Sequence, residues 1–396
     1  MIFTTETKNR ALKDLAKLIE ENKWDIIAQN KIDLNNAKNI DHTLIDRLKV
    51  DEKKVNGMVS AVEEIISDED PQGKVLHEYE HPNGMLVQNK VVPFGNILII
   101  YESRPDVTIE AAITAFKGGN KILLKGGKES KNSNIFLVSL WHKALEKNNI
   151  PKDFVTYLDI NREETQKLLK ENTHKLDLII PRGGEGLINY IRTNTSVPLL
   201  ISGRGNNFVY IHDKCDFDMA IDIVLNGKSR LSVCNAIDKV LIHKNLPNFS
   251  EKVKTLVQEL TQLNMEILAD GEQIQGIRGV CKMEENVYSE EFLAAKILLA
   301  EVSSIDEAID KINIHSGGHS AVIVASNDAT AEDFQNRVDC AAVYQNASSR
   351  FTDGGQLGFG AEIAISTQKL HFRGPVATGQ LVTNKWFIKG NGQIRG

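Results

Sequence analysis

Residues 96–127 read NILIIYESRPDVTIEAAITAFKGGNKILLKGG and decide the fold class of this 396-residue chain. Apolar runs at 97–100 and 121–124 flank an amphipathic stretch from Pro105 to Lys117. Short apolar runs separated by a segment of helix length are typical of parallel strands joined by crossover helices. The pattern therefore predicts a doubly wound α/β sheet of the kind that binds nucleotides.

The segments before this stretch predict helices and then a hairpin. Over residues 5–68, apolar residues recur three and four positions apart with charged residues between them, which predicts amphipathic helices. Residues 74–92 alternate in polarity around Pro82-Asn83-Gly84, which indicates a β-hairpin. The sheet region is expected to begin there.

The segments after it continue the same alternation. Apolar runs at 155–158 and 176–180, with helical patterns at 130–147 and 163–171, extend the first sheet. The alternation restarts after residue 206 with a run at 208–211, a helical pattern at 217–227 and a run at 239–242. We expect a second α/β domain as far as residue 372, and a last strand over 381–388.

Composition excludes several classes of protein. The 47 Lys and Arg residues are interspersed among 53 Asp and Glu, which leaves no basic field for nucleic acid or anionic lipid. No apolar run approaches the roughly 18 residues of a membrane-spanning helix, and no signal peptide precedes the first helix, so we expect a cytoplasmic protein with no membrane association. His315 and His319 flank a turn and lack further ligands, so we expect no metal.

Two glycine-rich turns follow predicted strands. Pro181-Arg182-Gly183-Gly184 precedes a helix, whose first N–H groups would favour a phosphate. Lys125-Gly126-Gly127-Lys128 follows a neighbouring strand, and its lysines could hold a ribose and a 2'-phosphate. Each turn alone could also be an ordinary turn with no ligand: a plain strand-to-helix turn in the first case and a solvated turn in the second. Together they indicate a dinucleotide.

Cys234 is the candidate nucleophile, in a loop between a helix and a strongly apolar strand. A thiol near amide donors can be held as thiolate and can attack a carbonyl, while a backbone N–H stabilises the oxyanion. The alternative is a small buried hydrophobe, which is the reading we give to Cys215, Cys281 and Cys340. Wide spacing without a Cys-x-x-Cys pair indicates neither zinc nor disulfides.

A polar run at 346–355 could bind a small anion. Its hydroxyl, amide and guanidinium groups are hydrogen-bond donors, and Arg350 could clamp a carboxylate or phosphate. Arg104, at the end of a predicted strand, is a second candidate in the expected crevice. A hydroxyl-rich turn with a surface arginine is an equal alternative. The candidate substrate-binding residues are Arg104, Asn235, Asn346, Ser348, Ser349 and Arg350.

These segments resemble the gamma-glutamyl phosphate reductases, a family within the aldehyde dehydrogenase superfamily. The likeness extends over nearly the whole chain. The matching segments are VPFG at 92–95, YESRP at 101–105, KGGKE at 125–129, IPRGG at 180–184, SVCNA at 232–236, and the run at 346–375.

The resemblance implies an aldehyde-dehydrogenase-like α/β fold. It implies a Rossmann-type cofactor-binding domain over 1–205 with a helical first part, a catalytic domain over 206–372, and a tail over 373–396 that returns to the cofactor domain as an oligomerisation strand. It further implies NADPH-dependent reduction of L-glutamyl 5-phosphate to L-glutamate 5-semialdehyde in proline biosynthesis. The implied partners are further copies of the chain, in a dimer or tetramer, and glutamate 5-kinase.

Individual roles also follow from the resemblance. Cys234 corresponds to the nucleophile that forms a thioester, Lys125 and Lys128 to residues near the adenosine ribose, and Glu291 to the carboxylate that orients the nicotinamide ribose. Ile201 stands where hydrolytic relatives have a glutamate that activates water, which suits a reductase. The implied cofactor-binding residues are Lys125, Gly126, Gly127, Lys128, Pro181, Arg182, Gly183, Gly184 and Glu291.

Two other functions remain open at this point. The same fold and nucleophile could act on another acyl phosphate or on a coenzyme A thioester, since the segment before Cys234 is one residue short of the family pattern. Alternatively, the chain could be a non-catalytic binding partner of the kinase. The intact SVCNA segment favours catalysis.

Overall fold

The protein is described by a computed structural model over residues 3–37, 42–283 and 287–395, and it divides into two compact units. Unit 1 comprises Met1–Ile201, Gly358–Ala364 and Val376–Gly396. Unit 2 comprises Ser202–Leu357 and Ile365–Pro375. The chain thus first changes unit just before residue 205, where we expected the domain boundary. Residues 358–364, which we expected in the catalytic domain, belong to unit 1.

The stretch at 96–127 forms the centre of the unit 1 sheet, and the predicted parallel order is confirmed. β3 lies between β4 and β6, so the strand order is β5-β4-β3-β6 and every pairing is parallel. The apolar runs are buried because helices cover both faces of the sheet. The strands are β3 (Asn96–Tyr101), β4 (Lys121–Lys125), β5 (Val155–Tyr157) and β6 (Leu178–Arg182).

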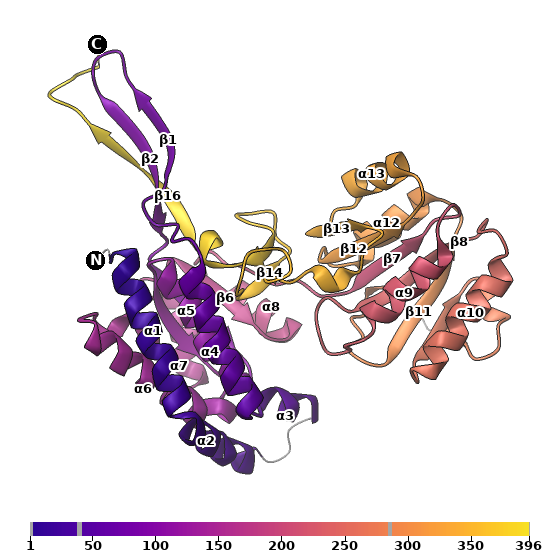
Figure 1. Cartoon of the computed structure of the whole chain (residues 1–396), viewed down its shortest axis with the longest axis horizontal. Helices are drawn as coiled ribbons and strands as arrows, with labels where there is room; N and C mark the ends of the chain where they lie inside the picture. The colour runs from indigo at the N-terminus through magenta and orange to yellow at the C-terminus, as the bar shows by residue number, and fades with distance from the viewer. Residues whose placement is uncertain (1–2, 38–41, 284–286, 396) are drawn as a thin grey trace. The chain divides into compact units, whose positions relative to one another are not determined.

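The helices of unit 1 follow the predicted periodicity (Figure 1). In α1 (Thr5–Glu21), the apolar positions Leu12, Leu15 and Ile19 are fully buried, and the Thr4 side chain caps the first turn. α5 (Pro105–Lys117) and α6 (Lys131–Lys147) are the expected crossover helices. The others are α2 (Lys23–Asn36), α3 (His42–Leu48), α4 (Glu52–Ser67), α7 (Arg162–Glu171) and α8 (Glu185–Asn194).

A three-stranded antiparallel sheet stands away from the helices of unit 1 (Figure 1). The predicted hairpin supplies β1 (Val75–Glu80) and β2 (Leu86–Pro93), and Gly84 takes a positive φ of 87° in their turn. The tail returns as β16 (Val382–Lys389), which pairs with β2 along its whole length. The predicted hairpin and last strand are therefore confirmed, and they form one sheet.

Unit 2 contains a seven-stranded parallel sheet in the order β10-β9-β11-β8-β7-β12-β13. β8, the strand directly after Cys234, therefore lies in the middle of the sheet. The strands are β7 (Asn207–Ile211), β8 (Ile237–His243), β9 (Glu266–Asp270), β10 (Cys281–Lys282), β11 (Lys296–Val302), β12 (Ser320–Val324) and β13 (Ala342–Gln345). β14 (Ala364–Ser366) and β15 (Gly374–Val376) pair with each other.

Side chains that alternate along the unit 2 strands build a core on each face. On β7, Val209 and Ile211 pack in one core, whereas Phe208 and Tyr210 pack in the other. The first core includes side chains of α9 (Phe217–Gly227) and α10 (Phe249–Gln262), and the second includes those of α12 (Ile305–His315) and α13 (Asp328–Arg337). The doubly wound α/β class is confirmed. The remaining short helices are α11 (Glu272–Gln275), η1 (Lys128–Ser130), η2 (Lys152–Phe154), η3 (Val287–Ser289), η4 (Ser349–Phe351) and η5 (Thr378–Gln380).

Candidate active site

Cys234 lies in the turn that connects α9 to β8 and is half-buried. The first residue of β7 and the segment just before this strand fix the backbone of Cys234. Asn207, fully buried, donates from Nδ2 to the carbonyl oxygens of Cys234 at 2.7 Å and Ala236 at 2.6 Å. Gly205 approaches so closely that a Cβ on it would lie 2.0 Å from the Cys234 carbonyl oxygen. The backbone of the predicted nucleophile is thus held by a glycine and an amide distant in sequence.

Two arginines place positive charge at this turn. Burial lowers the pKa of the Arg350 guanidinium, Arg230 lowers it further, and Cys234 acts in the opposite direction. The interaction is reciprocal, so the Arg350 cation favours the thiolate form of Cys234. The turn therefore has the electropositive surroundings that activate a cysteine nucleophile.

The predicted anion-binding run lies beside Cys234, and Asn235 holds it there. Asn235 donates from Nδ2 to the carbonyl oxygens of Arg350 at 3.2 Å and Thr352 at 3.1 Å, and its Oδ1 accepts from the Arg350 guanidinium. The buried Ser349 hydroxyl donates to the Asn235 carbonyl oxygen at 2.8 Å. Ser348 accepts from the Arg350 N–H. The structure thus brings four of the predicted residues together with Cys234.

Asn346 is used differently from its predicted neighbours. Its backbone has a positive φ of 52° after β13. Its side-chain amide accepts from the Ala325 N–H at 3.0 Å and donates to the Ala325 carbonyl oxygen at 2.9 Å. These two bonds attach the turn after β13 to the end of β12, so the structure gives the Asn346 side chain a role in holding the loop.

The other cysteines have different surroundings. Burial raises the pKa of Cys215 and that of Cys340 to about 11, which keeps both as neutral thiols. Cys281 is exposed at the edge strand β10. Arg373 acts to lower the pKa of Cys340, but burial outweighs it there, whereas half-buried Cys234 interacts with Arg350.

Glu291 lies close to the nucleophile segment. Its Oε1 accepts from the Gly205 N–H at 3.0 Å, and Gly205 is the residue packed against Cys234. Arg204 donates to the Ser289 carbonyl oxygen at 2.9 Å, which fixes the same segment. The residue predicted to orient a ribose and the predicted nucleophile are therefore joined through residues 204–205.

The two predicted cofactor turns lie at one edge of the unit 1 sheet. Lys125 ends β4 and Arg182 ends β6, and both strands flank β3, with Ile100 opposite Lys125 and Tyr101 opposite Arg182. Arg104 follows the end of β3 at the start of α5. Because the carboxyl ends of parallel strands meet at one edge, the structure gathers all the unit 1 candidates there.

The lysine turn leaves no room for side chains at its glycines. A Cβ on Gly126 would lie 2.2 Å from Asn134 Nδ2. Lys125 donates to the Gly126 carbonyl oxygen at 3.0 Å, and burial lowers the pKa of this lysine. Lys128 is exposed at the start of η1, so its charge is available at the surface of the sheet edge.

The second turn leads into the N-terminus of α8. Pro181 is buried in β6, and Gly183 and Gly184 are exposed. The Gly184 N–H donates to Glu102 Oε2 at 3.3 Å, so a carboxylate occupies the helix start in this structure. A negative group at this position is what the helix dipole and its N–H groups favour.

One protein-family model matches most of the chain. The model described as the aldehyde dehydrogenase family matches residues 3–274 and 277–361. The chain belongs to the aldehyde dehydrogenase family. This confirms the resemblance inferred from the sequence segments.

Full-length relatives place the chain more closely within the aldehyde dehydrogenases. It is 40% identical over 397 residues to a gamma-glutamyl phosphate reductase of Dictyoglomus thermophilum, covering 100% of this chain and 95% of the relative. It is 41% identical to one of Nautilia profundicola, covering 98% and 95%. The crystal structure of gamma-glutamyl phosphate reductase from Thermotoga maritima matches with a TM-score of 0.94 at 38% identity, covering 100% of this chain and 95% of that one.

Within each unit, several residues close to the predicted site residues were not predicted. Gly205 and Asn207 contact the Cys234 backbone, and Asp106 and Glu110 lie one helical turn apart on α5. Burial and then Asp106 raise the pKa of Glu110 to about 7, while Asp106 pairs with Arg104 at 2.9 Å. The four-residue spacing of Asp106 and Glu110 could have indicated that the two carboxyls lie close together on one helix face. Nothing in the sequence indicated that Asn207 contacts Cys234.

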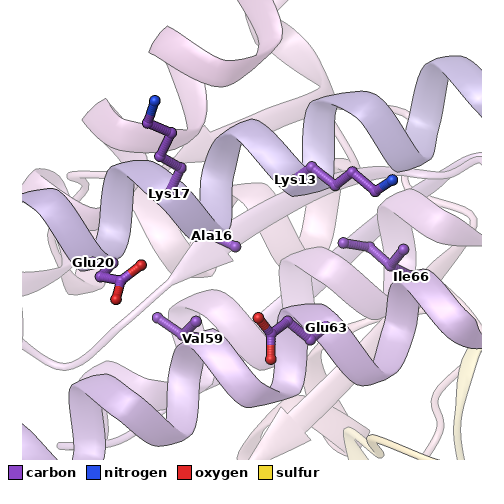
Figure 2. A pocket seen from close by; sticks show the side chains of 7 residues that line it. All are labelled: Lys13, Ala16, Lys17, Glu20, Val59, Glu63 and Ile66. Carbon is purple, nitrogen blue, oxygen red and sulfur yellow. The ribbon is translucent and has the colours of Figure 1, made fainter.

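One pocket of unit 1 contains none of the predicted residues. A shallow groove between α1 and α4 is lined by Lys13, Ala16, Lys17, Glu20, Val59, Glu63 and Ile66 (Figure 2). Among residues 3–37, 42–283 and 287–395, no three or more His, Cys, Asp or Glu side chains gather as a metal site. In that same part of the chain, no helix is both long and apolar enough to cross a bilayer.

Proposed function

We propose that this protein reduces L-glutamyl 5-phosphate to L-glutamate 5-semialdehyde and releases phosphate, as a cytoplasmic enzyme of proline biosynthesis. The observation that carries the proposal is identity near 40% to gamma-glutamyl phosphate reductases over essentially the full length of both chains. The surroundings of Cys234 support it, because a thiol beside Arg350 has the charge environment of a nucleophile.

The chemistry begins at Cys234. Its thiolate attacks the acyl carbon of the acyl phosphate, so that a C–S bond forms, the C–O bond to phosphate breaks, and inorganic phosphate leaves with the electron pair. Arg350 supplies positive charge for the thiolate and for the anionic substrate. Asn235 keeps the Arg350 turn in place through its bonds to Arg350 and Thr352. The product of this half-reaction is a thioester on Cys234.

The residues at the unit 1 sheet edge fit NADPH. Exposed Gly183 and Gly184 leave the backbone of the second turn open to a ligand, and the N-terminus of α8 already holds the carboxylate of Glu102, an anion that a phosphate would replace. Lys125 and Lys128 would hold the adenosine ribose and its 2'-phosphate, and Glu291 would orient the nicotinamide ribose. When bound, the cofactor contributes a hydride for the thioester carbon, after which the aldehyde leaves and the Cys234 thiolate is restored.

The reverse reaction tests the function. Purified enzyme is given glutamate 5-semialdehyde, NADP⁺ and phosphate, and NADPH formation is expected. A folded enzyme that forms no NADPH would contradict the proposal.

Two experiments would distinguish the proposed reaction from the alternatives. Faster turnover with coenzyme A in place of phosphate would identify an acyl-CoA reductase. Iodoacetamide labelling of Cys234 that substrate does not slow would favour a non-catalytic partner of glutamate 5-kinase.

We further propose that the protein is a homo-oligomer, a dimer or tetramer, assembled through the β1-β2-β16 sheet. Trp386, Ile388 and Leu76 are each more than half exposed there, and β1 and β16 are edge strands. Large exposed apolar side chains on open sheet edges are typical of an interface. Light scattering should show an oligomer that Ile388→Lys weakens, whereas a wild-type monomer would contradict the proposal. The same method can test binding of glutamate 5-kinase.

A further inference from the structure

A buried lysine lies in the middle of the unit 2 sheet. Lys239 is on β8, opposite Phe208 of β7 and Leu298 of β11, and its side chain is fully buried. An ammonium group is costly to bury unless strong partners compensate it. Its position in a central strand, three residues after Ala236 at the end of the Cys234 turn, therefore needs an explanation.

The Lys239 ammonium has three partners. It donates to Asn206 Oδ1 at 2.8 Å and to the Glu290 carbonyl oxygen at 2.7 Å. It also lies 3.6 Å from the centroid of the Phe292 ring, in cation–π geometry. Two of the three partners, Glu290 and Phe292, are the residues on either side of Glu291.

The third partner, Asn206, belongs to the segment that touches the nucleophile. Its Nδ2 donates to the carbonyl oxygens of Tyr288 at 2.7 Å and His315 at 2.8 Å. The preceding residue, Gly205, packs against the Cys234 backbone and donates to Glu291 Oε1 at 3.0 Å. Lys239 thus connects the Glu291 segment to the segment that supports Cys234.

We propose that Lys239 is a positioning residue, which holds Glu291 in place by bonding the Glu290 carbonyl, the Phe292 ring and Asn206. The inference rests on the proposed function, in which Glu291 orients the nicotinamide ribose. Lys239 itself touches neither substrate nor cofactor.

A second buried pair fixes the same segment from the other side. Asp238 accepts from Lys228 Nζ at 2.7 Å through Oδ1 and from the Phe292 N–H at 2.8 Å through Oδ2. With both Asp238 oxygens engaged, the Lys239 ammonium depends on neutral acceptors and the ring. Asp238 therefore holds the Phe292 N–H, and Lys239 holds the Glu290 carbonyl oxygen.

The charge state of Lys239 gives the proposal a second readout. Burial lowers the pKa of Lys239 to about 7; Asp238 and Glu290 act to raise it, while Lys228 and Lys296 lower it further. Below pH 7 the group is a cation, and its bonds to Glu290 and Asn206 are charge-assisted and stronger. Above that pH it becomes a neutral amine and holds the segment less firmly.

The test is the Lys239→Met variant, which keeps the length of the side chain and removes its donors. We expect the Kd for NADPH, from fluorescence titration, to rise about 10-fold, as for loss of other orienting partners. The ratio of variant to wild-type Kd should be largest below pH 7 and should fall above it. The KM for glutamate semialdehyde should not change, because Lys239 acts through Glu291.

Lys117→Met is the matched control. Lys117 is also fully buried, and its ammonium donates to Asn9 Oδ1 at 2.9 Å and the Ile66 carbonyl oxygen at 3.1 Å, but it lies in unit 1 away from both predicted cofactor turns. It should lower the melting temperature and leave the Kd for NADPH unchanged. If Lys239→Met does the same, Lys239 is structural only and the proposal is overturned.

A second variant covers a failure of Lys239→Met to fold. Lys239→Gln keeps one amide donor without the charge, so its Kd should rise less than that of Lys239→Met and should not follow the wild-type pH dependence. A wild-type Kd and pH profile in Lys239→Gln would overturn the proposal. NADPH binding can be measured without an acyl donor. A wild-type enzyme that binds NADPH but shows no turnover would therefore contradict the proposed reaction and leave the proposed role of Lys239 open to its own test.

Discussion

The two regions that carry the candidate site are built in opposite ways. At the unit 1 sheet edge, the turns 125–128 and 181–184 rely on backbone, glycines and the exposed Lys128. Around Cys234 in unit 2, buried side chains from distant segments, Asn207 above all, fix the backbone by hydrogen bonds. The unit 1 sheet edge leaves backbone groups and the Lys128 charge available to a ligand. The Cys234 turn holds the sulfur atom in place for attack on a substrate.

The contrast shows which changes each region should tolerate. The ligand-binding edge of the unit 1 sheet consists of backbone groups and depends on the charges around it. Single substitutions there should therefore alter the affinity for the ligand. A turn held by buried contacts depends on close packing, so single changes should alter turnover and stability. The following predictions test this difference.

Cys234→Ala should have the largest effect. We expect turnover to fall by at least about 10⁴-fold, because no other group can form the thioester. The Kd for NADPH should stay at the wild-type value, since the substitution removes only the Sγ atom and leaves the backbone contacts of Gly205 and Asn207 in place. Stopped-flow turnover and fluorescence titration measure the two quantities. Residual turnover near the wild-type rate would show that another residue is the nucleophile.

The buried polar groups of unit 2 should make stability depend on pH through His319. Burial lowers the pKa of this fully buried histidine to about 4, and its Nδ1 shares a hydrogen bond with Ser320 Oγ at 2.8 Å. The unfolded chain binds the proton below about pH 6.5, so stability is complete above that pH and is lost as the pH falls toward 4.

His319→Gln isolates this effect from other histidines. Between about pH 7.5 and about pH 5, the free energy of unfolding of the wild type should fall by about 2 kcal/mol more than that of the variant. Urea titrations at the two pH values measure the difference. Parallel pH curves for the two proteins would mean that His319 does not contribute.

Gly205→Ala should break the packing behind the nucleophile. The new Cβ would lie 2.0 Å from the Cys234 carbonyl oxygen, and because the obstacle is backbone, the turn must move. We expect kcat to fall about 100-fold, as for a displacement near 1 Å.

Gly57→Ala is the control for the added methyl group. Gly57 lies in α4 with nothing within 4 Å of an added Cβ, so this variant should gain about 0.5–1 kcal/mol of stability and keep its kcat. A fully active Gly205→Ala would show that the turn adapts to the methyl group.

Lys128→Glu should have the smallest effect, confined to the cofactor. Reversing this exposed charge should raise the KM for NADPH about 10-fold and leave kcat at saturating NADPH unchanged. The KM for NADH should change less, because NADH lacks the 2'-phosphate. Lys170→Glu, on the exposed face of α7, is the matched control and should leave both constants alone. Equal changes for both cofactors would remove Lys128 from the 2'-phosphate site.

Much of the fold could be predicted because its signals are local. The period-2 and period-3.6 patterns are set by how strands and helices expose their faces, so the strands at 97–100, 121–124 and 208–211 and the helix at 217–227 were predicted close to their observed bounds. The course of the chain was harder to predict. Residues 358–364 belong to unit 1, although the residues before and after them in the sequence belong to unit 2. No local sequence pattern indicates which unit such a short segment packs against.

For the candidate site, the sequence by itself predicted the glycine turns, Cys234 as the nucleophile and Arg350 near it, because special backbone and reactive groups require particular residue types. Only the tertiary structure decided what holds them. Gly205 and Asn207 contact Cys234, and Lys239 contacts the Glu290 carbonyl oxygen, although tens of residues separate these segments in the sequence. The sequence does not show whether a given asparagine or lysine is solvated or buried. These residues acquire their burial and their hydrogen-bond partners only once the sheet has formed.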